Sequence, residues 1–220
     1  MCRGGEGAID FMPATPCKEI IPCKEIIMKT PLTEAQIRAL KVGDKVLLSG
    51  QIVTGRDRVH KHLFNERPNK GDIPFNLDGG ALYHCGPVIR QMSGEYEFLA
   101  GGPTTSSRVE MYQADVIERY GIRAVIGKGG MGERTLEALA EHGCVYLHTI
   151  SGAAVYLAER VKNVAGVWKL DEFGAAEAMW LLEVEDFPAI VTMDTHGGNL
   201  HGEIKRYSLE AMKGLLAAPV

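Results

Sequence analysis

The 220-residue chain lacks any apolar run that approaches the roughly 18 residues of a transmembrane helix. It also lacks the amino-terminal pattern of a secretory signal, in which a positively charged stretch precedes an apolar one. We therefore expect a cytoplasmic protein that does not enter a membrane. Hydrophobic residues at 45% and charged residues at 24% are typical of a folded globular chain.

An excess of basic residues is also missing. The chain has 24 Lys and Arg against 28 Asp and Glu, which gives a formal net charge of -4. A protein with this balance has no positive field for a phosphate backbone, so we expect no nucleic-acid partner.

The cysteines are too few and too scattered for a disulfide framework or a zinc site. They number five and show no C-x-x-C spacing, so we expect no metal site on this chain. Cys17 and Cys23, one in each copy of a short amino-terminal repeat, could bind a metal or cluster as a pair, but two ligands leave its coordination incomplete. The five are Cys2, Cys17, Cys23, Cys85 and Cys144.

The amino-terminal 27 residues have no sustained periodicity. The hexapeptide P-C-K-E-I-I occurs at 16–21 and again at 22–27, which is too short a repeat for a solenoid. We expect residues 1–27 to be an irregular, flexible extension and residues 28–220 to form one domain. Met28 as the true first residue is a further hypothesis.

The rest of the chain alternates between strand and helix patterns. Thr33 and Gln36 have the spacing of a capping box, which predicts the start of a short helix. Further helices are predicted from Arg56 to near Pro68, from just after Thr105 to Gly121, from 132 to Gly143 and from 151 onward. Strands are predicted at 45–53, 81–84, 96–100, 122–126, 145–150, 179–184 and 189–193, before a turn at 194–199. This alternation indicates a mixed α/β domain.

Three glycine-rich turns carry the chemistry. We name residues 54–57, 101–108 and 127–132 the first, second and third glycine turns. Each follows a predicted strand and precedes a predicted helix, where free backbone N–H groups favour an anion. Arg56, Arg108 and Lys128 add one full positive charge to each turn, so a small dianionic acid is the expected guest.

Two features of these turns have alternative interpretations. One of the four hydroxyl residues at 104–107 is expected to cap the next helix. The third turn begins Gly-Lys, but a Walker loop needs Ser or Thr after the lysine, and here Gly129 follows. Nucleotide binding is therefore the weaker interpretation.

Five motifs follow one another along the chain: T-G-R-D-x-x-H-K at 54–61, G-P at 86–87, G-P-T-T-S-x-R at 102–108, G-K-G-G-M at 127–131 and D-T-H-G at 194–197. In this order they resemble the C-terminal domain of class I fumarases and the separate beta subunits of fumarate hydratase and L-tartrate dehydratase. The resemblance spans about residues 32–206.

The resemblance implies a three-layer β/β/α swivelling domain and a 4Fe-4S cluster held by a partner alpha subunit, with none bound by this chain. It implies that Arg56, Arg108 and Lys128 bind the substrate carboxylates and that Thr104 stands beside the carbon that loses a proton. A threonine hydroxyl is a poor base, so an acidic residue of the partner would have to activate it. The expected supporting residues are Asp57, His60 and Thr105, with Asp57 and His60 orienting Arg56 or the adjoining loop.

The expected activity is that of a fumarate hydratase beta subunit, which adds water reversibly to fumarate to give (S)-malate. The beta subunit of L-tartrate dehydratase is the close alternative. A non-catalytic carboxylate-binding or assembly subunit is a third, although a passive cover would need no converging cations. The expected assembly is a homodimer of beta chains within a heterotetramer.

Overall fold

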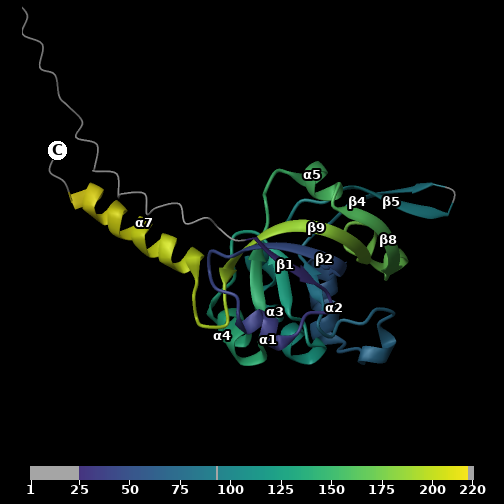
Figure 1. The fold of residues 1–220 in the computed structure, drawn as a ribbon, viewed down its shortest axis with the longest axis horizontal. Coiled ribbons are helices and arrows are strands. Elements are labelled where there is room, and N and C mark those ends of the chain that lie inside the picture. Colours follow the sequence, from purple (N-terminus) through teal and green to yellow (C-terminus); the bar gives the residue numbers. More distant parts are fainter. Residues whose placement is uncertain (1–24, 93, 218–220) are drawn as a thin grey trace, which may run out of the picture.

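The structure is a computed structural model that describes residues 25–92 and 94–217 (Figure 1). The strands are β1 (Glu25–Lys29), β2 (Lys45–Thr54), β3 (Ala81–Tyr83), β4 (Val88–Met92), β5 (Glu95–Ala100), β6 (Ala124–Gly127), β7 (Val145–His148), β8 (Val161–Trp168) and β9 (Met179–Met193). The α-helices are α1 (Glu34–Arg38), α2 (Asp57–Asn65), α3 (Glu110–Tyr120), α4 (Glu133–His142), α5 (Ala154–Ala158), α6 (Leu170–Phe173) and α7 (Leu200–Ala217). Two short 3-10 helices are η1 (Lys70–Asp72) and η2 (Ser106–Val109).

The main sheet has seven strands in the order β1-β2-β3-β6-β7-β9-β8, with an additional pairing between β2 and β9. That pairing closes a circuit through β2, β3, β6, β7 and β9. Strands β1, β2, β3, β6 and β7 run parallel to their neighbours in that series, whereas β9 is antiparallel to β2, β7 and β8. The carboxyl ends of β2, β3 and β6 therefore meet at one edge.

Successive side chains of the parallel strands point alternately into two separate hydrophobic cores. In β3, Ala81 and Tyr83 point into one core and Leu82 into the other. The first core lies toward the β4–β5 hairpin and β8, and includes Tyr96, Phe98 and Val164 at its margin. The second core receives the apolar faces of α2, α3 and α4. Figure 1 shows these helices on one side of the strands and the hairpin with α5 on the other.

Most of the predicted elements are confirmed. The side-chain oxygen of Thr33 accepts from the Gln36 backbone N–H, and the side-chain oxygen of Gln36 accepts from the Thr33 backbone N–H, as a capping box requires. Gly121 and Gly143 end α3 and α4 with φ values of 71° and 62°, a conformation in which glycine is not strained. The mixed α/β class is confirmed as well.

Two predictions of the sequence analysis are corrected. The strands at 179–184 and 189–193 are one strand, β9, because a bulge around Asp186, at φ 50°, keeps the chain in the sheet. The boundary at residue 27 falls inside β1, since Glu25 to Ile27 pair with Lys45 to Leu47 of β2. The remainder of the predicted extension lies outside the described residues.

The longest helix, α7, projects away from the rest of the domain (Figure 1). Neither it nor any other helix in the described ranges is both long and apolar enough to cross a bilayer. Elements β1, β4, β8, α6 and α7 had no counterpart among the predicted elements.

Candidate active site

The three glycine turns meet at the carboxyl edge of the parallel strands. The guanidinium of Arg108, on the second turn, lies 2.5 Å from the carboxylate of Asp57 on the first turn. The backbone N–H of Ser106 donates to the carbonyl of Lys128 on the third turn at 3.1 Å. Thr105 and Lys128 also form an isolated parallel bridge. The structure thus brings together the turns that carry Arg56, Arg108 and Lys128.

Arg56 lies half-buried between two chain segments. Its Nε is 3.4 Å from Oε1 of Glu177, and this Nε has no hydrogen-bond partner. On the other side is Gly86, where an added Cβ would lie 2.5 Å from both Cδ and Nη1 of Arg56. The glycine of the Gly86-Pro87 motif therefore provides the space that the arginine side chain occupies.

Thr104 and Lys128 are both partly exposed at this edge. The Thr104 hydroxyl donates to the carbonyl of His84 at 3.2 Å, and the Thr104 backbone N–H donates to the same oxygen at 2.7 Å. The Lys128 ammonium lies 3.4 Å from the hydroxyl of Ser151, which follows β7. Thr105 is exposed, and its side chain makes no capping bond to η2.

Two of the expected helix N-termini are already occupied by carboxylates of this chain. Glu177 accepts from the backbone N–H of Arg58 at the start of α2, at 3.0 Å. Glu110 accepts from the backbone N–H groups of Gly132 and Thr135 at the start of α4, at 2.7 and 3.1 Å. The expectation that these helix ends bind a substrate anion through their N–H groups is therefore wrong. The cationic side chains of the first and third turns, Arg56 and Lys128, remain candidates for binding an anion.

Two smaller expectations also change. Asp57, expected to orient Arg56 or its loop, pairs with Arg108. The N-cap residue of η2 is Thr105, without a side-chain bond, and the hydroxyl of Ser106 points inward, so none of these hydroxyls is seen to cap the helix. His60 does contact the first turn, since its Nδ1 is 2.8 Å from the Arg56 carbonyl oxygen.

A buried row of polar side chains lies beneath the turns. The Nε2 atoms of His60 and His84 are 3.0 and 2.9 Å from the amide oxygen of Gln113. The two imidazole rings are arranged edge to face, with their centroids 4.9 Å apart. His84 Nδ1 is 2.9 Å from the Ser106 hydroxyl. All four side chains are 1% exposed or less. Burial lowers the pKa of His60 and, more strongly, that of His84, because a charged imidazole loses its hydration there.

The row continues to the third turn. The hydroxyls of Ser106 and Tyr146 are 2.8 Å apart, and the Tyr146 oxygen also interacts with the backbone N–H of Gly130. A Cβ on Gly127 would lie 2.0 Å from the Ser106 hydroxyl oxygen, so only glycine allows this approach.

The sequence analysis did not single out Gln113 or Tyr146. A signal existed for Gln113, which falls on the apolar face of its helix between Val109 and Val116. Tyr146 gave no such signal, since a tyrosine in a buried strand is ordinary core.

The described cysteines do not fit a cluster site. Cys85 and Cys144 are each 1% exposed or less, and burial raises the pKa of the Cys85 thiol to about 12 and that of Cys144 further still. The thiolate form that binds iron is therefore disfavoured at both positions. No group of three His, Cys, Asp or Glu side chains suited to a metal occurs within 25–92 and 94–217.

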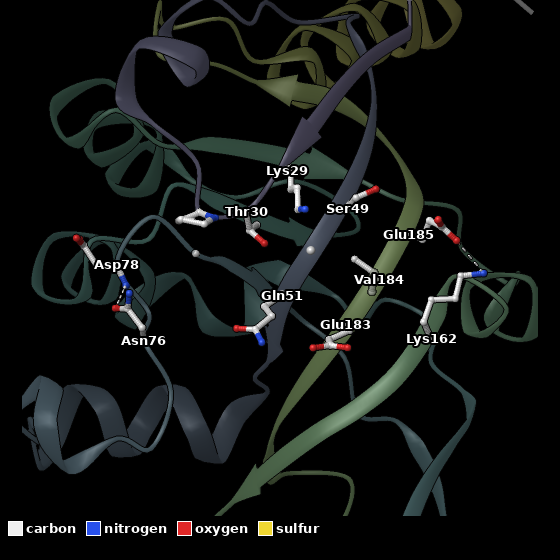
Figure 2. Close-up of a pocket in the computed structure, with 13 residues that line it drawn as sticks. Lys29, Thr30, Ser49, Gln51, Asn76, Asp78, Lys162, Glu183, Val184 and Glu185 are labelled. Carbon is white, nitrogen blue, oxygen red and sulfur yellow. Dashed lines mark hydrogen bonds and ion pairs between the residues drawn. The ribbon is translucent and has the colours of Figure 1, made fainter.

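A separate cavity of about 580 Å³ opens beside the middle of β2 (Figure 2). Its charged lining consists of Lys29, Asp78, Lys162, Glu183 and Glu185, with Lys162 paired to Glu185 at 3.3 Å. Because carboxylates outnumber cations there, this cavity does not suit a dianion. The carboxyl edge of the strands is the better candidate, because the three turns that carry Arg56, Arg108 and Lys128 meet there.

The D-T-H-G motif lies elsewhere in the fold. Asp194 accepts the backbone N–H groups of Val42, His196 and Gly198, each at 2.9 Å. Val42 precedes the amino end of β2, whereas Arg56 follows its carboxyl end. Asp194 therefore stabilises a turn away from the converging cations.

The family described as Fumarase C-terminus matches residues 6–204, and the chain belongs to this family. It is 53% identical over 188 residues to a protein of Geobacillus stearothermophilus named as a class I fumarate hydratase, covering 85% of this chain and 35% of that protein. The chain thus spans about a third of the length of that relative.

Two further relatives are named as beta subunits of L(+)-tartrate dehydratase. The protein of Methanocaldococcus jannaschii is 38% identical over 186 residues, covering 84% of this chain and 95% of that subunit. The protein of Escherichia coli K12 is 37% identical over 187 residues, covering 84% of this chain and 90% of that subunit.

Proposed function

We propose that this chain is the beta subunit of a 4Fe-4S-dependent hydro-lyase that reversibly hydrates fumarate to (S)-malate. The observation that supports the proposal is the meeting, at one sheet edge, of the three turns that carry Arg56, Thr104 with Arg108, and Lys128. The higher identity to the relative named for fumarate, 53% against 37–38%, favours fumarate over tartrate. L-tartrate dehydration is the second candidate, supported by relatives of matching length.

Each residue has a role in this proposal. Two arginines and a lysine neutralise a dicarboxylate and stabilise the negative charge that builds up beside a carboxylate as the proton leaves. The Thr104 oxygen takes that proton while its own hydroxyl proton passes to a carboxylate of the partner subunit. In the present structure this hydroxyl donates to a backbone carbonyl, which cannot accept a proton, so a partner group is required.

The assembly follows from the same reasoning. The 4Fe-4S cluster belongs to a separate alpha subunit, because the described cysteines of this chain do not fit one. Coverage of 90–95% of proteins named as beta subunits supports a separate chain. The proposal includes two beta chains within a heterotetramer and a cytoplasmic location.

The proposed fold is the three-layer β/β/α swivelling domain. Two cores on opposite faces of the parallel strands support it, since one core is bounded by further strands and the other by helices. Such a domain could meet its partner through the strand edge that carries the cations.

The test is reconstitution of this chain with its cluster-bearing partner. The purified chain alone should be colourless and inactive, and the complex should consume fumarate with a higher kcat/KM than L-tartrate. The reverse preference would assign tartrate dehydration. Robust hydration of fumarate by the chain alone would contradict the two-chain proposal, and a complex that binds dicarboxylates without turnover would leave a non-catalytic binding subunit.

A further inference from the structure

The amide of Gln113 lies between His60, which contacts the first glycine turn, and His84, which contacts the second. Its amide oxygen is within 3.0 Å of the imidazoles of both His60 and His84, and its amide nitrogen has no hydrogen-bond partner although it is buried. A buried amide nitrogen with two unpaired hydrogens is costly, so this arrangement needs an explanation.

The bonds around the His60 ring determine which of its nitrogens carries a hydrogen. Its Nδ1 faces the carbonyl oxygen of Arg56, which can only accept, so Nδ1 carries a hydrogen. If an amide oxygen also faced Nε2, both ring nitrogens would need hydrogens and the fully buried ring would be a cation. Burial opposes that charge more than the neighbouring Asp57 and Glu177 favour it. The ring is therefore neutral, and its bare Nε2 needs a donor.

A half-turn of the Gln113 amide supplies that donor without changing the shape of the side chain. The two hydrogens of the amide nitrogen then reach the Nε2 atoms of His60 and His84. His84 in turn carries its hydrogen on Nδ1 and donates to the Ser106 hydroxyl, which donates to Tyr146. The Gln113 amide oxygen is then unpaired in place of the two amide hydrogens, and the Tyr146 hydroxyl, which accepts from Ser106 and from the Gly130 N–H, has no acceptor for its own hydrogen among the described residues.

We propose that Gln113 is a positioning residue whose amide nitrogen donates to His60 and His84 and so fixes the separation of the glycine turns that carry the cations. Through His60 it holds the backbone of Arg56. Through His84 it holds Thr104, whose N–H and hydroxyl both meet the His84 carbonyl. Its kinetic consequences rest on the proposed function, whereas its proton positions do not.

The third turn is attached to the same support. In this arrangement the Ser106 hydroxyl accepts a hydrogen bond from His84 Nδ1, and the Ser106 backbone N–H donates to the Lys128 carbonyl at 3.1 Å. Tyr146 extends the row to the N–H of Gly130. The absence of a side chain at Gly127 leaves the room that this row needs.

Nitrogen-15 NMR of the imidazole rings in the full chain tests the proton positions directly. Single histidine substitutions assign the signals. We expect both His60 and His84 to be neutral near pH 7 with the hydrogen on Nδ1. A hydrogen on Nε2 of His84, or a doubly protonated His60, would overturn the proposal, and this measurement needs neither the partner nor a Gln113 variant.

Two variants test the positioning role in the reconstituted enzyme. Gln113→Glu replaces the donor by an acceptor, so His60 should become doubly protonated, and Gln113→Met removes the bonds while keeping the length. Each should lower kcat/KM for fumarate by about 10-fold to 10²-fold, the usual effect of misplacing substrate-binding groups. The matched control is Tyr120→Phe, which removes a buried hydroxyl bond from the same helix at a distance from the turns.

The outcomes separate the two proposals. Unchanged kcat/KM and unchanged nitrogen-15 signals in Gln113→Glu would contradict the positioning role. An equal loss of kcat/KM in Tyr120→Phe would show that Gln113 acts only through the general stability of the domain, which would contradict the positioning role. A wild-type complex without hydratase activity, but with both imidazoles protonated on Nδ1, would contradict the proposed function and leave the proton arrangement standing.

Discussion

Arg108 Nη2 lies 2.5 Å from Asp57 Oδ2, joining two side chains that are 51 positions apart in the sequence. The side chains are 54% and 38% exposed, and ion pairs this exposed contribute about 1 kcal/mol or less to stability. The pair therefore orients Arg108 more than it stabilises the fold. An incoming carboxylate can share Arg108 with Asp57, or displace Asp57 from it, at small cost, which suits the proposed role of Arg108 in substrate binding.

The cations should affect substrate binding most. Arg108→Ala and Lys128→Ala should raise KM for fumarate steeply, and kcat should also fall because charge builds up as the proton leaves. Arg108→Lys should restore only part of the loss, because an ammonium cannot make two parallel hydrogen bonds to a carboxylate. Steady-state kinetics of the complex measures both constants. Unchanged KM in Lys128→Ala would remove that residue from the binding set.

Thr104→Ala should separate proton transfer from binding. If Thr104 takes the proton, kcat should fall by about 10²-fold or more while KM changes little. The neighbouring Thr105→Ala is the matched control, since that side chain is exposed and makes no capping bond. A near-normal kcat in Thr104→Ala would show that another group removes the proton.

Glu110 should stabilise the domain without touching substrate. Glu110→Gln removes the charge that meets two backbone N–H groups and the Thr135 hydroxyl at the start of α4, so the free energy of unfolding should fall by about 1–2 kcal/mol. Denaturant melts measure the loss, with Glu118→Gln on the exposed side of the same helix as control. A large rise in KM with no loss of stability would instead place that helix end in the binding site.

Asp194 should make stability depend on acid pH. Burial alone would raise the pKa of Asp194, but the N–H groups of Val42, Gly198 and His196 lower it below its usual value. A carboxyl whose pKa is lower in the folded state stabilises the protein above the unfolded pKa of about 4 and loses that effect as pH falls below it. The difference in unfolding free energy between wild type and Asp194→Asn should therefore shrink below about pH 4. A difference that stays constant down to pH 3 would show that the charge does not matter.

Deleting residues 1–27 should lower stability more than deleting residues 1–24. The longer deletion removes the pairing of Glu25, Ile26 and Ile27 with β2, together with the contact of Ile26 with the first core. Thermal melts of the two truncated chains give the comparison. Equal melting temperatures would mean that β1 pairs through Met28 and Lys29 alone.

Local signals predicted most of the elements that carry the site. The capping box at Thr33 and the helix-ending glycines at 121 and 143 depend on neighbouring residues, and all three are confirmed. The second and third turns were likewise placed from strand, glycine and helix patterns. Their convergence could be anticipated only through the family resemblance, because strand order is not written in any single segment.

The errors share a physical cause. Whether a helix N-terminus is free depends on what faces it, and the carboxylates that fill α2 and α4 come from Glu177 and Glu110, on other elements. The same holds for Asp57, whose partner is distant in sequence. The strands predicted at 179–184 and 189–193 left residues 185–188 between them, yet the bulge at Asp186 lets β9 continue along β2.

The long strand β9 also determines when the domain can fold. It pairs with β2, β7 and β8, and the circuit of strands stays open until it is in place. During synthesis β2 and its parallel neighbours leave the ribosome far earlier than Met193 does. The nascent chain must therefore hold unpaired strand edges until β9 has emerged, so the circuit of strands is expected to close only then and to need protection from aggregation in the interval.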